Sequence, residues 1–138
     1  AKVQPEFTET GTYSAGVIYA YENDTHCQKL CFEQDEYGDH RVVSVRTLDT
    51  SDDNNHQAIT APYVYMRLSS DGTTLGSYFS EDGKIWRMAR FYKNDFPEKL
   101  LIGISSQSPK DNEHTCLFTE VSLTDKPVAD FRKGNIAE

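Results

Sequence analysis

The sequence predicts an all-β protein, a sandwich or barrel of antiparallel strands, and three observations carry that prediction. Short runs of alternating apolar and polar residues recur along the 138 residues, with turn residues between them. No stretch of useful length repeats apolar residues at helical spacing. Aromatic residues make up 12% of the chain, mostly Tyr and Phe, and these favour pleated, half-buried surfaces.

The first half of the chain contains three predicted strands. Residues 14–22 form the first alternating run, which ends in a turn at residues 23–24. Residues 27–34 and 40–48 follow, and the turn residues around Gly38 predict that these two runs form a hairpin.

Two Asp-Gly turns organise the second half. The dipeptide at residues 71–72 joins run 63–70 to run 73–80, which is the strongest local hairpin signal. A second Asp-Gly, at residues 82–83, leads into run 84–92 and its single tryptophan.

Residues 99–108 and 115–124 are expected to complete the sheets. The domain is then expected to cover residues 1–124. Residues 125–138 contain Pro127, charges and Gly134, and are expected to form a C-terminal tail, either a loose arm or a short helix.

Alternation gives several strands one apolar and one mixed face. In run 63–70 the apolar face carries Val64, Met66 and Leu68, and the opposite face carries Tyr63, Tyr65 and Arg67. In run 27–34 the apolar face carries Leu30 and Phe32, and the opposite face Lys29, Cys31 and Glu33. In run 40–48 the apolar face carries Val43, Val45 and Thr47, and the opposite face Val42, Ser44 and Arg46. Tyr mixed with Arg, Lys and Glu suits a surface that binds polar ligands, and cross-strand ion pairs are the alternative.

The acidic composition excludes some classes of partner. The formal net charge is -8 and the pI is about 4.9. This argues against sequence-independent nucleic-acid binding and against docking on anionic membranes, since both need clustered Lys and Arg. Neutral sugars, cations and basic proteins remain compatible.

The three cysteines do not form a disulfide framework, because their number is odd. Cys27 and Cys31 are expected on one face of a strand, too far apart to bond. Free thiols in a reducing compartment follow, and this favours a cytoplasmic location.

Four pieces of sequence carry a family resemblance by their order: KLCFE, SVRT with SDDNN, YFSEDGKIW, and GISSQSP. Over roughly residues 13–123 the chain resembles the regulation-of-enolase-protein family, whose domains are mostly of unknown function. That family is similar to the concanavalin A-like lectin/glucanase superfamily. The resemblance implies a concanavalin A-like jelly-roll β-sandwich of two curved antiparallel sheets.

Members of that family carry further N-terminal strands before the part that this chain matches. The resemblance therefore implies a sandwich that lacks these strands or receives them from another chain. An uncovered edge favours association, so a homodimer through an exposed sheet edge is expected.

The leading functional hypothesis is a non-catalytic, lectin-like module that binds carbohydrate. Sugars are bound by stacking on aromatic rings and by directional hydrogen bonds. Trp86 has two interpretations, a plug in the sandwich core or a platform for a sugar. The predicted ligand-binding residues are Lys29, Glu33, Arg46, Tyr65, Arg67, Tyr78, Trp86 and Gln107.

Two other functions stay open. One is a protein-interaction or regulatory module acting on a metabolic enzyme, as the family name implies. The other is a cryptic glycoside hydrolase. Glu33 and Asp35 match the first step of the glucanase carboxylate pattern, but Tyr37 and Gly38 stand where the third acid belongs, so no catalytic residue is predicted.

A polar segment at residues 49–57 is expected to form a loop. Its carboxylates could supply oxygen ligands for calcium, and Asp49, Asp52 and Asp53 are the predicted metal ligands. A solvated loop with Asx turns is the favoured alternative. No other cofactor is expected.

Overall fold

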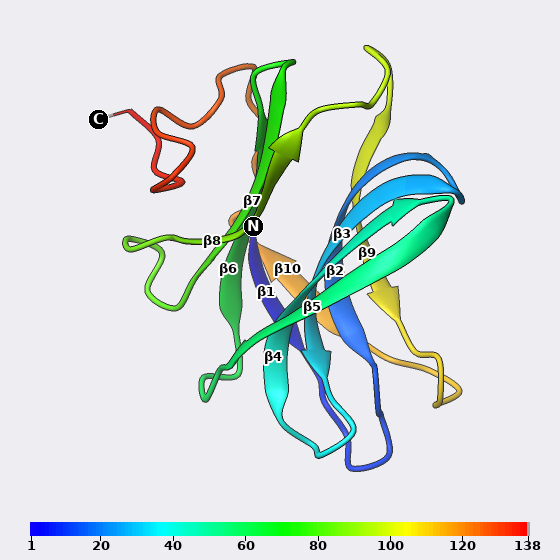
Figure 1. The fold of residues 1–138 in the computed structure, drawn as a ribbon. Coiled ribbons are helices and arrows are strands. Elements are labelled where there is room, and N and C mark those ends of the chain that lie inside the picture. The colour runs from blue at the N-terminus through cyan, green and yellow to red at the C-terminus, as the bar shows by residue number, and fades with distance from the viewer. Residues whose placement is uncertain (138) are drawn as a thin grey trace.

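The computed structural model describes residues 1–137 and is a sandwich of two five-stranded antiparallel sheets (Figure 1). The first sheet has the order β10-β1-β6-β7-β8 and the second the order β5-β4-β3-β2-β9. The strands are β1 (Lys2–Pro5), β2 (Ala15–Asn23), β3 (His26–Gln34), β4 (His40–Leu48), β5 (Thr50–Ala58), β6 (Val64–Ser70), β7 (Thr74–Ser80), β8 (Arg87–Lys93), β9 (Leu101–Gln107) and β10 (Cys116–Thr119). The predicted all-β sandwich is confirmed.

No helix within residues 1–137 has the length and apolar character needed to cross a membrane.

The predicted hairpins form in the expected places. Strands β3 and β4 pair from His26↔Leu48 to Gln34↔His40. Strands β6 and β7 pair across the first Asp-Gly turn, where the Asp71 carboxylate accepts the backbone N–H groups of Thr73 and Thr74 at 2.9 and 2.7 Å. Gly72 adopts a φ of 88°, a conformation that disfavours a β-carbon.

The main core lies between the two sheets, and on β3 and β6 it uses the faces that alternation predicts. The prediction for β4 was wrong: Val42 faces the core, while Val43 and Val45 face outward, because both faces of this strand bury apolar side chains and alternation alone does not choose between them. Leu30, Phe32 and Val42 of the second sheet face Val64 and Met66 of the first, and all five are fully buried. A residue shift of one in any of these strands would turn its apolar set outward, so the core fixes the register.

The segment predicted as a polar loop at residues 49–57 is instead strand β5, which pairs with β4 from Leu48↔Thr50 to Arg41↔Ala58. Nearly all of its side chains are exposed, and β5 is the edge strand of its sheet. Since neither face of this strand is buried, its sequence has no apolar alternation to reveal it. The short strand β1 was also missed, because four residues are too few for a pattern.

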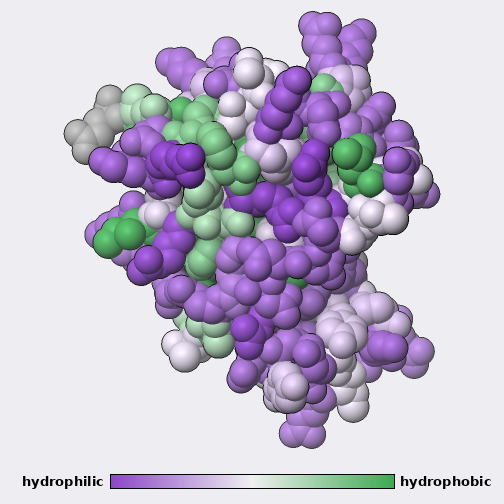
Figure 2. Space-filling model, in the orientation of Figure 1, coloured by the Kyte–Doolittle hydropathy of each residue, from purple (hydrophilic) through white to green (hydrophobic). Residues whose placement is uncertain are grey.

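The C-terminal segment packs against the outer face of the first sheet and contains no helix within residues 125–137. Its residues Asp130 and Asn135 form an isolated β-bridge, and Val128 is buried. The hydroxyl of Tyr78 donates to the carbonyl of Phe131 at 2.6 Å. Figure 2 shows a mostly hydrophilic surface on which hydrophobic side chains gather beside this segment.

Gly134 lets the segment approach the sheet. It has a φ of 67°, and a β-carbon there would collide with the ring of Tyr78. Tyr78 is fully buried under this segment, so the tail is anchored to the domain.

Replacing Tyr78 with Phe should release the tail while leaving the ring in place. We expect a loss of about 1 kcal/mol in the free energy of unfolding, because the partly buried Phe131 carbonyl loses its donor. Urea titration measures this loss, and limited proteolysis should cut the variant earlier within residues 125–137. Unchanged proteolysis would mean that the hydrogen bond does not hold the tail.

Candidate functional site

A row of polar side chains crosses the outer face of the second sheet. Glu33 on β3 and Gln107 on β9 are both register partners of Ala15 on the strand between them. The small Ala15 side chain leaves room for the longer ones to meet above it. The Gln107 amide donates to a Glu33 carboxylate oxygen at 3.2 Å, and Lys29 Nζ donates to the Gln107 carbonyl oxygen at 3.2 Å.

An apolar floor lies beneath this row. Ala15, Val17, Cys31, Val43 and Val45 form a second cluster on the face turned away from the first sheet, and none is more than 8% exposed. No second layer of the described chain packs on this face, so the long polar side chains around the floor provide its cover. A dry floor with a polar margin is typical of a ligand-binding surface.

Two tyrosines stand beside the row. Tyr19 packs against the apolar floor, and its ring meets that of Tyr21 edge to face, with centroids 6.3 Å apart. The register also places Asp53 and Asn55 of β5 on this face, opposite Val45 and Val43. Asn55 was not predicted to lie on this face, because its strand looks like a loop in the sequence.

The Glu33 carboxyl group is a weaker acid than an ordinary glutamate. Burial raises its pKa to about 7, Lys29 opposes that shift, and Asp53 adds to it. The side chain can therefore carry a proton near neutral pH and act as either a donor or an acceptor of hydrogen bonds.

The structure separates the other predicted ligand residues from this row. Tyr65, Arg67, Tyr78 and Trp86 belong to the first sheet and its β7–β8 connection. The Arg67 guanidinium stacks on the Trp86 ring at 3.7 Å and donates to the Gly134 carbonyl. Tyr78 is fully buried and cannot be a platform for a ligand. Arg67 therefore contacts the C-terminal segment rather than sharing a face with Lys29 and Glu33.

Trp86 follows the second Asp-Gly turn but precedes β8, which begins at Arg87. Its ring is partly buried under Arg67, on the side of the sandwich that the C-terminal segment covers. Trp86 is therefore not a plug in the core between the sheets, and its ring is instead a platform for the Arg67 guanidinium.

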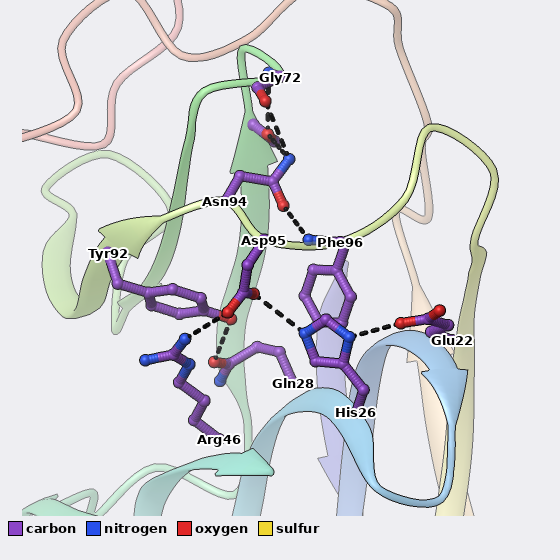
Figure 3. Close-up of polar contacts among 10 residues, drawn as sticks. Glu22, His26, Gln28, Arg46, Gly72, Tyr92, Asn94, Asp95 and Phe96 are labelled. Atoms are coloured by element: carbon purple, nitrogen blue, oxygen red, sulfur yellow. Dashed lines mark hydrogen bonds and ion pairs between the residues drawn. The ribbon is translucent and has the colours of Figure 1, made fainter. Parts of the chain in front are cut away.

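Arg46 lies apart from both the polar row and the Arg67–Trp86 contact, where loop β8–β9 meets the β2–β3 hairpin (Figure 3). It donates to Asp95 at 2.7 Å and stacks on the Tyr92 ring at 4.1 Å. Asp95 also contacts His26 Nε2 at 3.0 Å, and Glu22 contacts His26 Nδ1 at 2.5 Å.

The His26 imidazole is held between two carboxylates and stacked on Phe96, with ring centroids 4.3 Å apart. Burial lowers the pKa of His26, but the hydrogen bonds with Asp95 and Glu22 outweigh it and raise the pKa above its usual 6.5. This arrangement clamps the loop onto the hairpin.

The predicted calcium ligands do not gather. Asp49 lies between β4 and β5 with a φ of 62°, while Asp52 and Asp53 are neighbours on a strand and point to opposite faces. Asp52 pairs with Arg90. Among residues 1–137, no group of three or more His, Cys, Asp or Glu side chains could hold a metal ion.

The comparisons with known proteins bear on the fold. The family described as "Protein of unknown function (DUF1349)" matches residues 1–126. No curated protein matches the chain. A solved structure, described as a functionally unknown protein from Saccharomyces cerevisiae, shares the fold with a TM-score of 0.71 and 21% sequence identity, over 84% of this chain. The match spans 65% of that chain, less than two thirds of its length.

Replacing Glu33 with Gln should change how stability depends on pH. The folded protein holds the Glu33 proton more tightly than the unfolded chain does, so this stabilisation is complete below pH 4.5 and is lost as pH rises through about 7. At pH 8 the variant should be more stable than the wild type by on the order of 1–2 kcal/mol, and at pH 4 equal to it. Urea titrations at the two pH values measure the difference, and equal stabilities at both would contradict a raised pKa.

Replacing His26 with Gln should have the opposite pH dependence. The raised folded-state pKa stabilises the protein below pH 6.5, and that contribution is lost as pH rises through the folded pKa. The variant should lose more stability at pH 5.5, where His26 is charged in the folded protein, than at pH 8.5. The same loss at both values would show that the His26 charge plays no part in the clamp.

Proposed function

Because the chain belongs to the DUF1349 family, whose function is unknown, we propose a function from its geometry: a non-catalytic module that binds carbohydrate. The proposed site is the outer face of the second sheet. The observation that carries the proposal is the hydrogen-bonded row of Lys29, Gln107 and Glu33 beside Tyr19, over an apolar floor.

Each part of this face suits a sugar. Lys29 offers donors, Glu33 offers acceptors, and Gln107 offers both, so hydroxyl groups that donate and accept find partners. Tyr19 and Tyr21 present rings for the apolar face of a pyranose. A neutral ligand also avoids repulsion from a chain with a net charge of -8.

Binding is favoured over hydrolysis for a geometric reason. A retaining glycosidase needs two carboxyl groups about 5–5.5 Å apart around the bond it cleaves. Glu33 has the raised pKa of a general acid, but its hydrogen-bonding partner in the row is an amide. Asp53, the other carboxyl group that the register places on this face, lies two strands away on β5 and in line with Lys29 rather than with Glu33. The family that the sequence resembles is itself similar to the lectin/glucanase superfamily, and this similarity supports the proposal.

Isothermal titration against a panel of neutral oligosaccharides tests the proposal. The wild type should bind at least one member, and Lys29→Ala should weaken that binding by tenfold or more, which corresponds to about 1.4 kcal/mol. Lys93→Ala is the matched control, because Lys93 is an exposed lysine on β8 of the other sheet and should leave affinity unchanged.

Each titration is run with calcium and with chelator, so that the predicted ligands Asp49, Asp52 and Asp53 are tested at the same time. Affinity that disappears in chelator would restore the calcium prediction. Release of reducing ends from the oligosaccharide would identify a hydrolase instead. No binding across the panel, or equal binding by Lys29→Ala, would overturn the proposal.

A further inference from the structure

The four edge strands of the two sheets are not equally protected. An edge strand exposes unpaired backbone groups, and proteins shield such edges with charges, bulges or short length. Strand β5 carries two aspartates and a register shift, β8 carries three cationic residues and a register shift, and β10 has only four residues.

Strand β9 has none of these devices. Its seven residues, LIGISSQ, include no charge and no proline, and its pairing with β2 runs without a shift from Leu101 to Gln107. Within residues 1–137 its other edge has no strand partner. A straight, uncharged edge of this length is a ready template for another strand.

Large aliphatic side chains are exposed along the same strand. Leu101, Ile102 and Ile104 are 69%, 51% and 49% exposed. Ile102 and Ile104 point into the gap between the sheets, which spread apart toward the top of Figure 1. That gap holds a cleft of about 860 Å³, also lined by Ile18, Met66, Leu75 and Phe96.

We propose that β9 pairs with β9 of a second copy of this chain, in an antiparallel arrangement about a twofold axis. The two five-stranded sheets would then join into one continuous sheet. Full overlap of the seven residues Leu101–Gln107 centres the pairing on Ile104, so that Leu101 lies opposite Gln107.

The distribution of charge around β9 favours a second copy of this chain as its partner. Two chains of net charge -8 repel each other, and β9 is a strip on which neither contributes charge. Just outside the strand, Glu98 precedes the centre by six positions and Lys110 follows it by six. The antiparallel register therefore brings each Glu98 toward the partner's Lys110, once at either end.

The same register buries the aliphatic side chains. Residues directly opposite each other in an antiparallel pair project to the same face, so the two Ile104 side chains meet beside the cleft. Ile102 lies on that face as well, and the clefts of the two copies adjoin there. The face that carries Gln107 is the opposite one, so this inference does not rest on carbohydrate binding.

Sedimentation velocity over a concentration series from about 1 µM to about 100 µM tests the proposal. The wild type should shift from monomer to dimer within that range. Ile104→Lys should be monomeric throughout, because two buried lysines would face each other across the axis. Ile85→Lys is the matched control, since Ile85 is 67% exposed in the β7–β8 connection of the other sheet and outside β9, and this variant should dimerise like the wild type.

Thermal unfolding of both variants establishes that each is folded before its mass is interpreted. A wild type that stays monomeric over the whole series overturns the proposal, and so does a dimer that persists in Ile104→Lys. A monomeric wild type whose melting temperature rises with a synthetic peptide of the β9 sequence would assign the edge to a foreign strand, which also overturns self-pairing.

Discussion

Burial of two apolar sheet faces against each other is the interaction on which this structure depends. Full burial of a Leu, Phe, Val or Met side chain contributes about 1.5–3 kcal/mol, and the inter-sheet core includes Leu30, Phe32, Val42, Val64, Met66 and Phe79. Because side chains alternate along a strand, this one demand decides which residues face outward. The position of Lys29 and Glu33 on an outer face is a consequence of Leu30 and Phe32 facing inward.

The same constraint explains which parts of the fold could be predicted from sequence. Strands β3 and β6 carry a visible period of two, and their faces and the hairpins they form with β4 and β7 were predicted correctly. Strand β4 buries apolar side chains on both faces, so the sequence did not show that Val42 rather than Val43 faces the core. Strand β5 buries neither face, so residues 49–57 had the composition of a loop. Strand β5 is held in place by its backbone hydrogen bonds with β4, and backbone hydrogen bonds do not depend on residue type, so the sequence does not reveal them.

The candidate site shows where sequence reasoning stops. Alternation correctly placed Lys29 and Glu33 together, because both lie on one strand. It gave no information on which sheet each strand would join, and so Arg67 and Tyr78 were grouped with them although they lie on the first sheet. The link from Gln107 to Glu33 depends on Ala15 standing between them, a coincidence of three strands that only the folded register reveals.

The apolar floor of the candidate site contains a thiol whose reactivity depends on local opening of the structure. Cys31 is fully buried in it, and burial raises the pKa of its thiol to about 12. Since only a solvated thiolate reacts with alkylating reagents, Cys31 is inert while the floor is closed and reactive when the side chains above it part. The alkylation rate of Cys31 therefore reports how often this surface opens far enough to expose the floor. A ligand bound on the surface would slow that rate.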